Sequence, residues 1–183
     1  MGNVVGSIVV PGHDFIADTV SDLAAGRYEI IQDVALYGFA ASLLALSLAA
    51  AHLHNGRIRW SILTFSLALL AVCVVIIGAR NEYGDSDTGG VVIHIYLVYA
   101  LGGLFFTAFL IGGLSGRRVA SYLPPVSWAC LALWTVGAPT FFFLPTGWDG
   151  LWERGLGVIC AVWCVVFAVS LRQFAQRNQG RLN

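Results

Sequence analysis

Charge is scarce in this sequence, and lysine is absent from it. Charged residues make up 11% of the 183 positions, whereas ordinary soluble domains carry about 25%. All ten basic residues are arginine, and ten carboxylates balance them to a formal net charge of zero. Because 58% of the residues are hydrophobic, the shortage of charge argues against a soluble domain and indicates an integral membrane protein.

Several signatures of soluble enzymes and transporters are also missing. Neither Ser7 nor Ser21 lies in a Gly-x-Ser-x-Gly elbow, and no glycine-rich phosphate loop occurs outside the apolar stretches. The cysteines form no Cys-x-x-Cys pair and lie in apolar stretches, where free cysteine packs as a small hydrophobic residue. No inverted repeat or mid-span charge favours a transporter. The arginine-bearing loops are explained without a nucleic-acid partner.

Five apolar segments are long enough to cross a bilayer, which takes about 20 helical residues. They run near residues 30–52, 60–79, 91–115, 125–145 and 153–172. The opening stretch is too short to span alone and reads as the outer end of a partial first span. The sequence therefore predicts one all-α transmembrane bundle over residues 1–183, with five full spans, a partial first one and a short amphipathic segment at 12–28.

The arginines are sorted between alternate connecting segments. Seven lie in segments that contain no carboxylate: Arg57, Arg59, Arg117, Arg118, Arg172, Arg177 and Arg181. The other segments hold all ten carboxylates and three arginines. Since arginine-rich short loops stay in the cytoplasm, we expect a multi-pass protein of the cytoplasmic membrane, with its C-terminus inside and residues 12–28 outside. The lipid bilayer is then an expected partner.

Glycines mark one surface of the third predicted span. The surface comprises Gly102, Gly103, Gly112, Gly113 and Gly116, of which Gly112 and Gly116 stand at Gly-x-x-x-Gly spacing. Small residues at this spacing allow close helix contacts. We expect that contact inside the bundle rather than at a dimer seam.

Three aspartates recur at four-residue spacing in GHDFIADTVSDLAAG, residues 12–26. If this stretch is helical, Asp14, Asp18 and Asp22 share one stripe, opposite an apolar one. Like charges at this spacing repel by about 0.2–0.5 kcal/mol per pair. The aspartate stripe is therefore expected to face solvent, a bound cation or a basic partner.

Three stretches, PGHDFIADTVSDLAAG, HIYLVYALGG and GLWERGLGVICAVW, together resemble a family. The chain is similar over nearly its whole length to the bacterial and archaeal membrane proteins grouped as domain of unknown function 998. The resemblance implies a six-helix bundle and a site, but no activity. The matching residues are Ser21, Asp22, Leu23, His94, Glu153 and Arg154.

Charge sorting places these residues on the outer face, where two interpretations involve no catalysis. In the first, the aspartates face water, as charge runs usually do. In the second, which we favour as a function, Arg154 pairs with Asp18 or Asp22 and closes the bundle. The resulting outer-face cap recognises a small or lipid-derived ligand. Its predicted members are Asp18, Ser21, Asp22, His94, Glu153 and Arg154.

The third interpretation is a metal-dependent hydrolase of lipid amides or esters. His13, His94 and one carboxylate, from Asp14, Asp18 or Asp22, would hold zinc with water in the open position. Glu153 would then be the general base and the candidate catalytic residue. The sequence fixes neither the cofactor nor the oligomeric state, so whether the protein is an enzyme stays open.

Overall fold

The computed structural model describes residues 2–20, 23, 28–54, 56–79, 93–145 and 147–180. Within these ranges the regular structure is entirely helical. Its elements are α1 (Gly2–Val9), α2 (Glu29–His52), α3 (Ile58–Ala79), α4 (Ile93–Ser115), the 3₁₀ turn η2 (Gly116–Arg118), α5 (Leu123–Phe141) and α6 (Asp149–Gln179). The predicted all-α class is confirmed.

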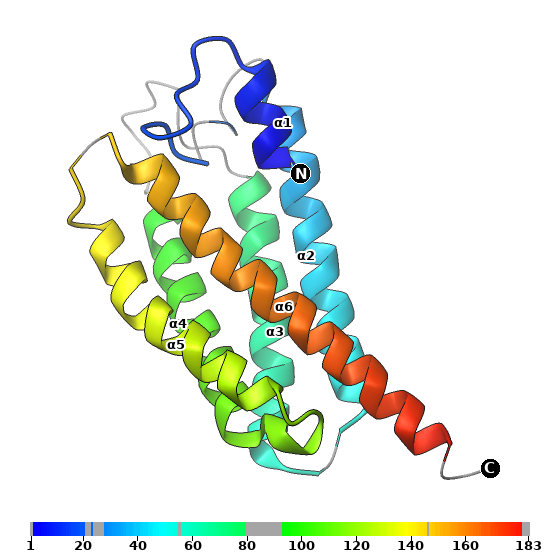
Figure 1. The fold of residues 1–183 in the computed structure, drawn as a ribbon. Coiled ribbons are helices and arrows are strands. Elements are labelled where there is room, and N and C mark those ends of the chain that lie inside the picture. Colours follow the sequence, from blue (N-terminus) through cyan, green and yellow to red (C-terminus); the bar gives the residue numbers. More distant parts are fainter. Residues whose placement is uncertain are drawn as a thin grey trace.

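The five long helices pack as neighbours in chain order (Figure 1). Helix α2 packs on α3, α3 on α4, α4 on α5 and α5 on α6, while α6 crosses the bundle and also touches α2. Helix α1 lies beside the start of α2. Packing of each helix on the next one along the chain gives an up-and-down order.

Four described helices are long and apolar enough to cross a membrane: Glu29–His52, Ile58–Ala79, His94–Arg118 and Asp149–Gln179. The remaining predicted span corresponds to α5, which is not among these four, so its crossing stays a prediction. Helix α6 has 31 residues, or about 46 Å at 1.5 Å per residue. The helix is longer than the thickness of a hydrocarbon core, about 30 Å, because its polar ends continue the helix beyond the apolar stretch of residues 153–172.

Aromatic side chains fill the middle of the bundle. Trp163 and Phe167 of α6 are fully buried and stack with ring centroids 5.0 Å apart. The indole Nε1 of Trp163 donates to Ser127 Oγ of α5 at 2.9 Å, so the buried polar atom has a partner. Large apolar side chains on the outside, such as Phe65 and Val136, are more than half exposed. An apolar exterior on long helices fits a lipid environment.

Two glycines near the end of α4, Gly112 and Gly113, face α5. A Cβ added to Gly112 would lie 2.5 Å from Ser127 Oγ, and one added to Gly113 would lie 2.7 Å from the Trp128 ring. Only glycine permits this approach, because both distances are far below van der Waals contact. The predicted close packing inside the bundle is confirmed for Gly112, Gly113 and Gly116, whereas a Cβ added to Gly102 or Gly103 would meet nothing within 4 Å.

Charge separates to the two ends of the molecule. The connection from α2 to α3, the turn η2 and the last turns of α6 lie at one end, which we call the arginine end (Figure 1). Its described basic residues are Arg57, Arg59, Arg117, Arg118, Arg172 and Arg177. Helix α1 and the starts of α2 and α6 lie at the opposite end, the α1 end. The described acidic residues are Asp14, Asp18, Glu29, Asp33, Asp149 and Glu153, and all lie at or near this end.

Candidate functional site: a buried arginine at the α1 end

Arg154 lies in the second turn of α6 and is only 8% exposed. Its Nη1 donates to the main-chain carbonyls of Phe15, at 3.0 Å, and Asp18, at 2.8 Å. Its Nη2 donates to Ser7 Oγ at 3.4 Å and lies 2.9 Å from His13 Nε2. One guanidinium group therefore ties α1 and the following segment to α6. Its planar set of five donors suits several acceptors at once.

The contact with Arg154 fixes the roles of the His13 ring nitrogens. A guanidinium group only donates hydrogen bonds, so His13 Nε2 must accept, and the ring proton then sits on Nδ1. That nitrogen lies 3.4 Å from Asp18 Oδ2. The His13 side chain is 3% exposed and that of Asp18 40%. A polar chain thus runs from buried Arg154 through His13 to a carboxylate that solvent reaches.

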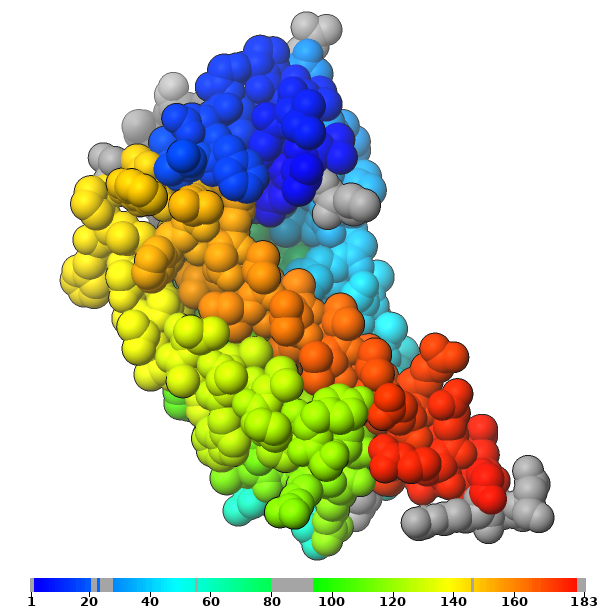
Figure 2. Space-filling view, viewed as in Figure 1, coloured from blue at the N-terminus to red at the C-terminus, as the bar shows by residue number. Residues whose placement is uncertain are grey.

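Four successive carbonyls of residues 15–18 all accept hydrogen bonds from α6. Besides the two bonds from Arg154, Leu151 N donates to Ile16 O at 3.0 Å and Gly150 N donates to Ala17 O at 3.3 Å. The first N–H groups of a helix have no partner within it, and here the segment supplies one to each of these two. Figure 2 shows the segment, in blue, lying directly on the orange start of α6.

Glu153 holds the next part of the same segment. Its Oε2 accepts a hydrogen bond from Val20 N at 2.7 Å. Two adjacent residues of α6 therefore bind the segment in complementary ways. Glu153 accepts a hydrogen bond from a main-chain N–H group, and Arg154 donates hydrogen bonds to main-chain carbonyls. We call Ser7, His13, Phe15, Asp18, Glu153 and Arg154 the Arg154 network.

Phe15 and Gly150 both lie close to the Arg154 guanidinium. The Phe15 ring covers the guanidinium, with its centroid 4.4 Å from Arg154 Cζ, a cation–π contact. A Cβ at Gly150 would overlap the Asp18 carbonyl and lie 2.6 Å from Arg154 Nη1. Sequence reasoning missed both residues. The available signal was the glycine one helical turn before Arg154.

The segment around Asp14 is not the continuous helix on which the aspartate stripe depended. Residues 11–20 form turns. Asp14 Oδ1 accepts from Ile16 N at 2.8 Å and Ala17 N at 3.3 Å, while Asp18 Oδ2 accepts from Asp14 N at 2.7 Å. Such side-chain bonds to the main chain compete with helix formation. The bonds from Ile16 and then Ala17 also lower the pKa of the Asp14 carboxyl.

The structure brings together part of the predicted outer-face cap. Arg154, Glu153 and Asp18 meet, but Arg154 binds the Asp18 carbonyl, while the Asp18 carboxylate faces His13 and the Asp14 N–H. For Asp18, the expected carboxylate pairing is replaced by a main-chain contact, whereas the pairing with Asp22 stays a prediction. Ser21 and Asp22 lie outside the described residues. His94 stands in the first turn of α4, and its role in the cap stays a prediction.

The described residues contain no group of three His, Cys, Asp or Glu side chains that could hold a metal ion. Both ring nitrogens of His13 already face protein atoms, Arg154 Nη2 and Asp18 Oδ2. A zinc ion bound to this ring would have to displace one of them. The set that includes Asp22 lies outside the described part. The hydrolase therefore stays a prediction that no contact described here favours.

Long apolar helices in a bundle define a polytopic membrane protein, and in the described part of the chain the one buried charged side chain, Arg154, lies at an end of the bundle. The particular family follows from comparison with known proteins. Residues 1–170 match the profile of the family described as protein of unknown function DUF998, and the chain belongs to this family. No curated protein and no solved structure matches it. The resemblance read from the sequence is confirmed, and the function has to be argued from the site.

Proposed function

We propose that the Arg154 network is the centre of an outer-face cap that recognises a small or lipid-derived ligand through the ligand's hydrogen-bond donors. The observation that carries the proposal is a set of buried acceptors without hydrogen-bond partners at the α1 end of the bundle. Among the described residues, Asn3 Oδ1, Gln32 Oε1 and Asp149 Oδ1 are buried without a hydrogen-bond partner. All belong to the first turns of α1, α2 or α6, at the α1 end.

The donors of the network do not serve these acceptors. Arg154 Nη1 and Nη2 are committed to the carbonyls of Phe15 and Asp18, to Ser7 and to His13. A buried acceptor without a donor costs about 1–3 kcal/mol, and folded proteins keep few of them. Hydroxyl or amino groups of a bound molecule would supply the missing donors, as would ordered water.

Apolar surface beside the network supports a lipid-derived ligand. Phe15 is 43% exposed and Ile16 is 46% exposed, next to the carbonyls that α6 holds. A ligand with a donor-rich head and an apolar part would contact both kinds of surface. The apolar helices begin at this level, so such a ligand would reach the cap from the bilayer.

Native mass spectrometry of the purified protein tests the proposal. We expect the wild-type protein to retain a discrete bound species, and Gln32→Leu, which deletes one unpartnered acceptor, to lose it at least tenfold. Thr64→Val is the matched control, because Thr64 Oγ1 is also buried without a partner but lies in α3, outside the cap. Equal retention in both variants, or no species beyond bulk lipid, would mean that water satisfies the acceptors.

A further inference from the structure

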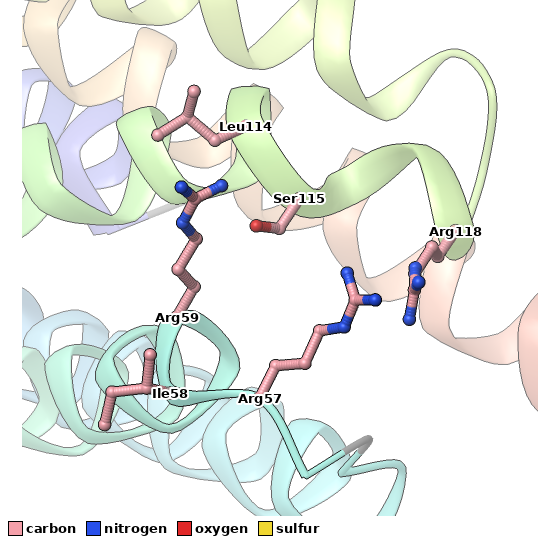
Figure 3. A pocket seen from close by; sticks show the side chains of 6 residues that line it. All are labelled: Arg57, Ile58, Arg59, Leu114, Ser115 and Arg118. Carbon is pink, nitrogen blue, oxygen red and sulfur yellow. The ribbon is translucent and has the colours of Figure 1, made fainter.

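A cavity of about 330 Å³ opens at the arginine end, between the start of α3 and the junction of α4 with η2. It is lined by Arg57, Ile58, Arg59, Leu114, Ser115 and Arg118. Figure 3 shows the guanidinium groups of Arg57 and Arg118 pointing toward one another, and that of Arg59 rising toward Leu114. Two connections far apart in sequence thus bring three guanidinium groups to one space.

The neighbouring segments carry no Asp or Glu side chain. The sequence has no Asp or Glu at positions 34–81, 88–148 or 154–183, which include every segment at this end. Among the described residues, neither Arg59 nor Arg118 has a hydrogen-bond acceptor or an ion-pair partner. Arg177, by contrast, donates from Nη2 to Val119 O at 2.7 Å. Like charges around a cavity repel one another, and an anion inside it would reverse the sign of that interaction.

Guanidinium groups fit phosphate oxygens, because their paired N–H donors match two oxygens at once. The Ser115 hydroxyl adds one more donor to the lining. Ile58 is 73% exposed and Leu114 is 49% exposed, so the basic lining borders an apolar surface. A free phosphate would contact only the basic lining, whereas a phospholipid would contact both the basic lining and the apolar surface beside it.

We propose that this cavity binds a phosphate-bearing anion, and that the anion is the headgroup of an anionic phospholipid whose acyl chains lie against Ile58 and Leu114. Anionic lipids are attracted to clustered arginines at the membrane surface. The lined cavity adds a defined site to that general attraction. The proposal does not depend on the ligand of the outer-face cap, which lies at the other end of the bundle.

The test compares two variants that lose the same charge. Arg59→Gln with Arg118→Gln removes two cavity arginines, whereas Arg117→Gln with Arg172→Gln removes two that do not line it. Native mass spectrometry would measure binding of phosphatidylglycerol to each purified protein in detergent. We expect the cavity variant to bind at least tenfold more weakly than wild type and the control to change less than twofold. Circular dichroism checks that both variants keep their helices.

A second arm separates the lipid from free phosphate. Inorganic phosphate, added alone at millimolar concentration, should not raise the unfolding temperature of the wild-type protein, whereas phosphatidylglycerol should raise it. Equal loss of lipid binding in both charge variants would overturn the site, since net charge alone would then explain the attraction. Stabilisation by inorganic phosphate that disappears only in the cavity variant would overturn the lipid assignment. Arg59→Lys with Arg118→Lys keeps the charge, and should bind lipid more weakly than wild type if paired donors matter.

Discussion

At the residue scale, the main-chain partners of Arg154 could not have been chosen from the sequence. A sequence shows which residues carry carboxylates, but it does not show where main-chain carbonyls point. Asp18 and Asp22 were therefore the natural candidates. The turns at residues 11–20 aim the carbonyls of Phe15 and Asp18 at Arg154, and leave the Asp18 carboxylate to His13. The structure does place Asp18, Glu153 and Arg154 at the same docked segment, and their role in a ligand cap stays a prediction.

Charge reversal distinguishes a main-chain contact from a carboxylate pair. Arg154→Asp should lower the free energy of unfolding by at least about 2 kcal/mol, because carbonyls that accepted from a charged group lose their donor. Adding Asp18→Arg should recover none of this loss, since the Asp18 carboxylate does not bind Arg154. Thermal or denaturant unfolding in detergent measures both. Recovery in the double variant would show that the two side chains do pair.

Asp14 should show a pH dependence of a definite sign. Its pKa is lowered from the ordinary value of 3.8, chiefly by the bond from Ile16 N and then by that from Ala17 N. A carboxyl whose pKa falls on folding stabilises the folded state at pH values above its unfolded pKa, and that contribution is lost as pH falls through the folded pKa. The difference in unfolding temperature between wild type and Asp14→Asn should therefore be constant above about pH 5. It should vanish in more acid solution.

A direct titration of Asp14 by NMR provides the independent check. A carboxyl pKa at or above 3.8 would contradict the two main-chain bonds in solution.

At the scale of the elements, the lengths of the apolar stretches predicted which segments are helical, but they did not predict how far α6 extends. The starts of α2 and α4 agree with the predicted spans within a few residues, because the apolar stretches begin there. Helix α6 runs from Asp149 to Gln179, well beyond the predicted 153–172, since a helix continues outside the bilayer without apolar side chains. The turns at residues 11–20 were missed because one aspartate spacing was read as a helix.

Gly150 tests how the segment at residues 15–18 docks on α6. Gly150→Ala places a Cβ on the Asp18 carbonyl and beside Arg154 Nη1, so it should destabilise the protein by about 1–3 kcal/mol. Gly157→Ala is the matched control on the same helix, because nothing lies within 4 Å of its added Cβ. The control should be neutral or stabilising by up to about 1 kcal/mol, as alanine is the better helix former.

The two glycine variants also report on the docked segment itself. Limited proteolysis should cut near residues 11–20 faster in Gly150→Ala than in Gly157→Ala, because only the first separates the segment from α6. Equal cleavage and equal stability would show that the close approach of Gly150 to Asp18 is not kept in the membrane.

At the scale of the whole molecule, the separated charges predict how the protein sits in the membrane. Six described arginines gather at one end and the described carboxylates gather at or near the other. Arginine-bearing short loops are retained in the cytoplasm, so we expect the arginine end inside and the α1 end outside. This orientation would place the ligand cap outside the cell and the arginine-lined cavity against the inner leaflet.

Cysteine labelling in intact cells tests this orientation. With the four native cysteines replaced by alanine, Phe143→Cys reports on the connection before α6, where Phe143 is 85% exposed. Asn178→Cys reports on the last turn of α6. A membrane-impermeant thiol reagent should label the first in intact cells and the second only after lysis. The reverse pattern would place the acidic end in the cytoplasm, and the phosphate site would then face a leaflet where the inner-surface potential does not act.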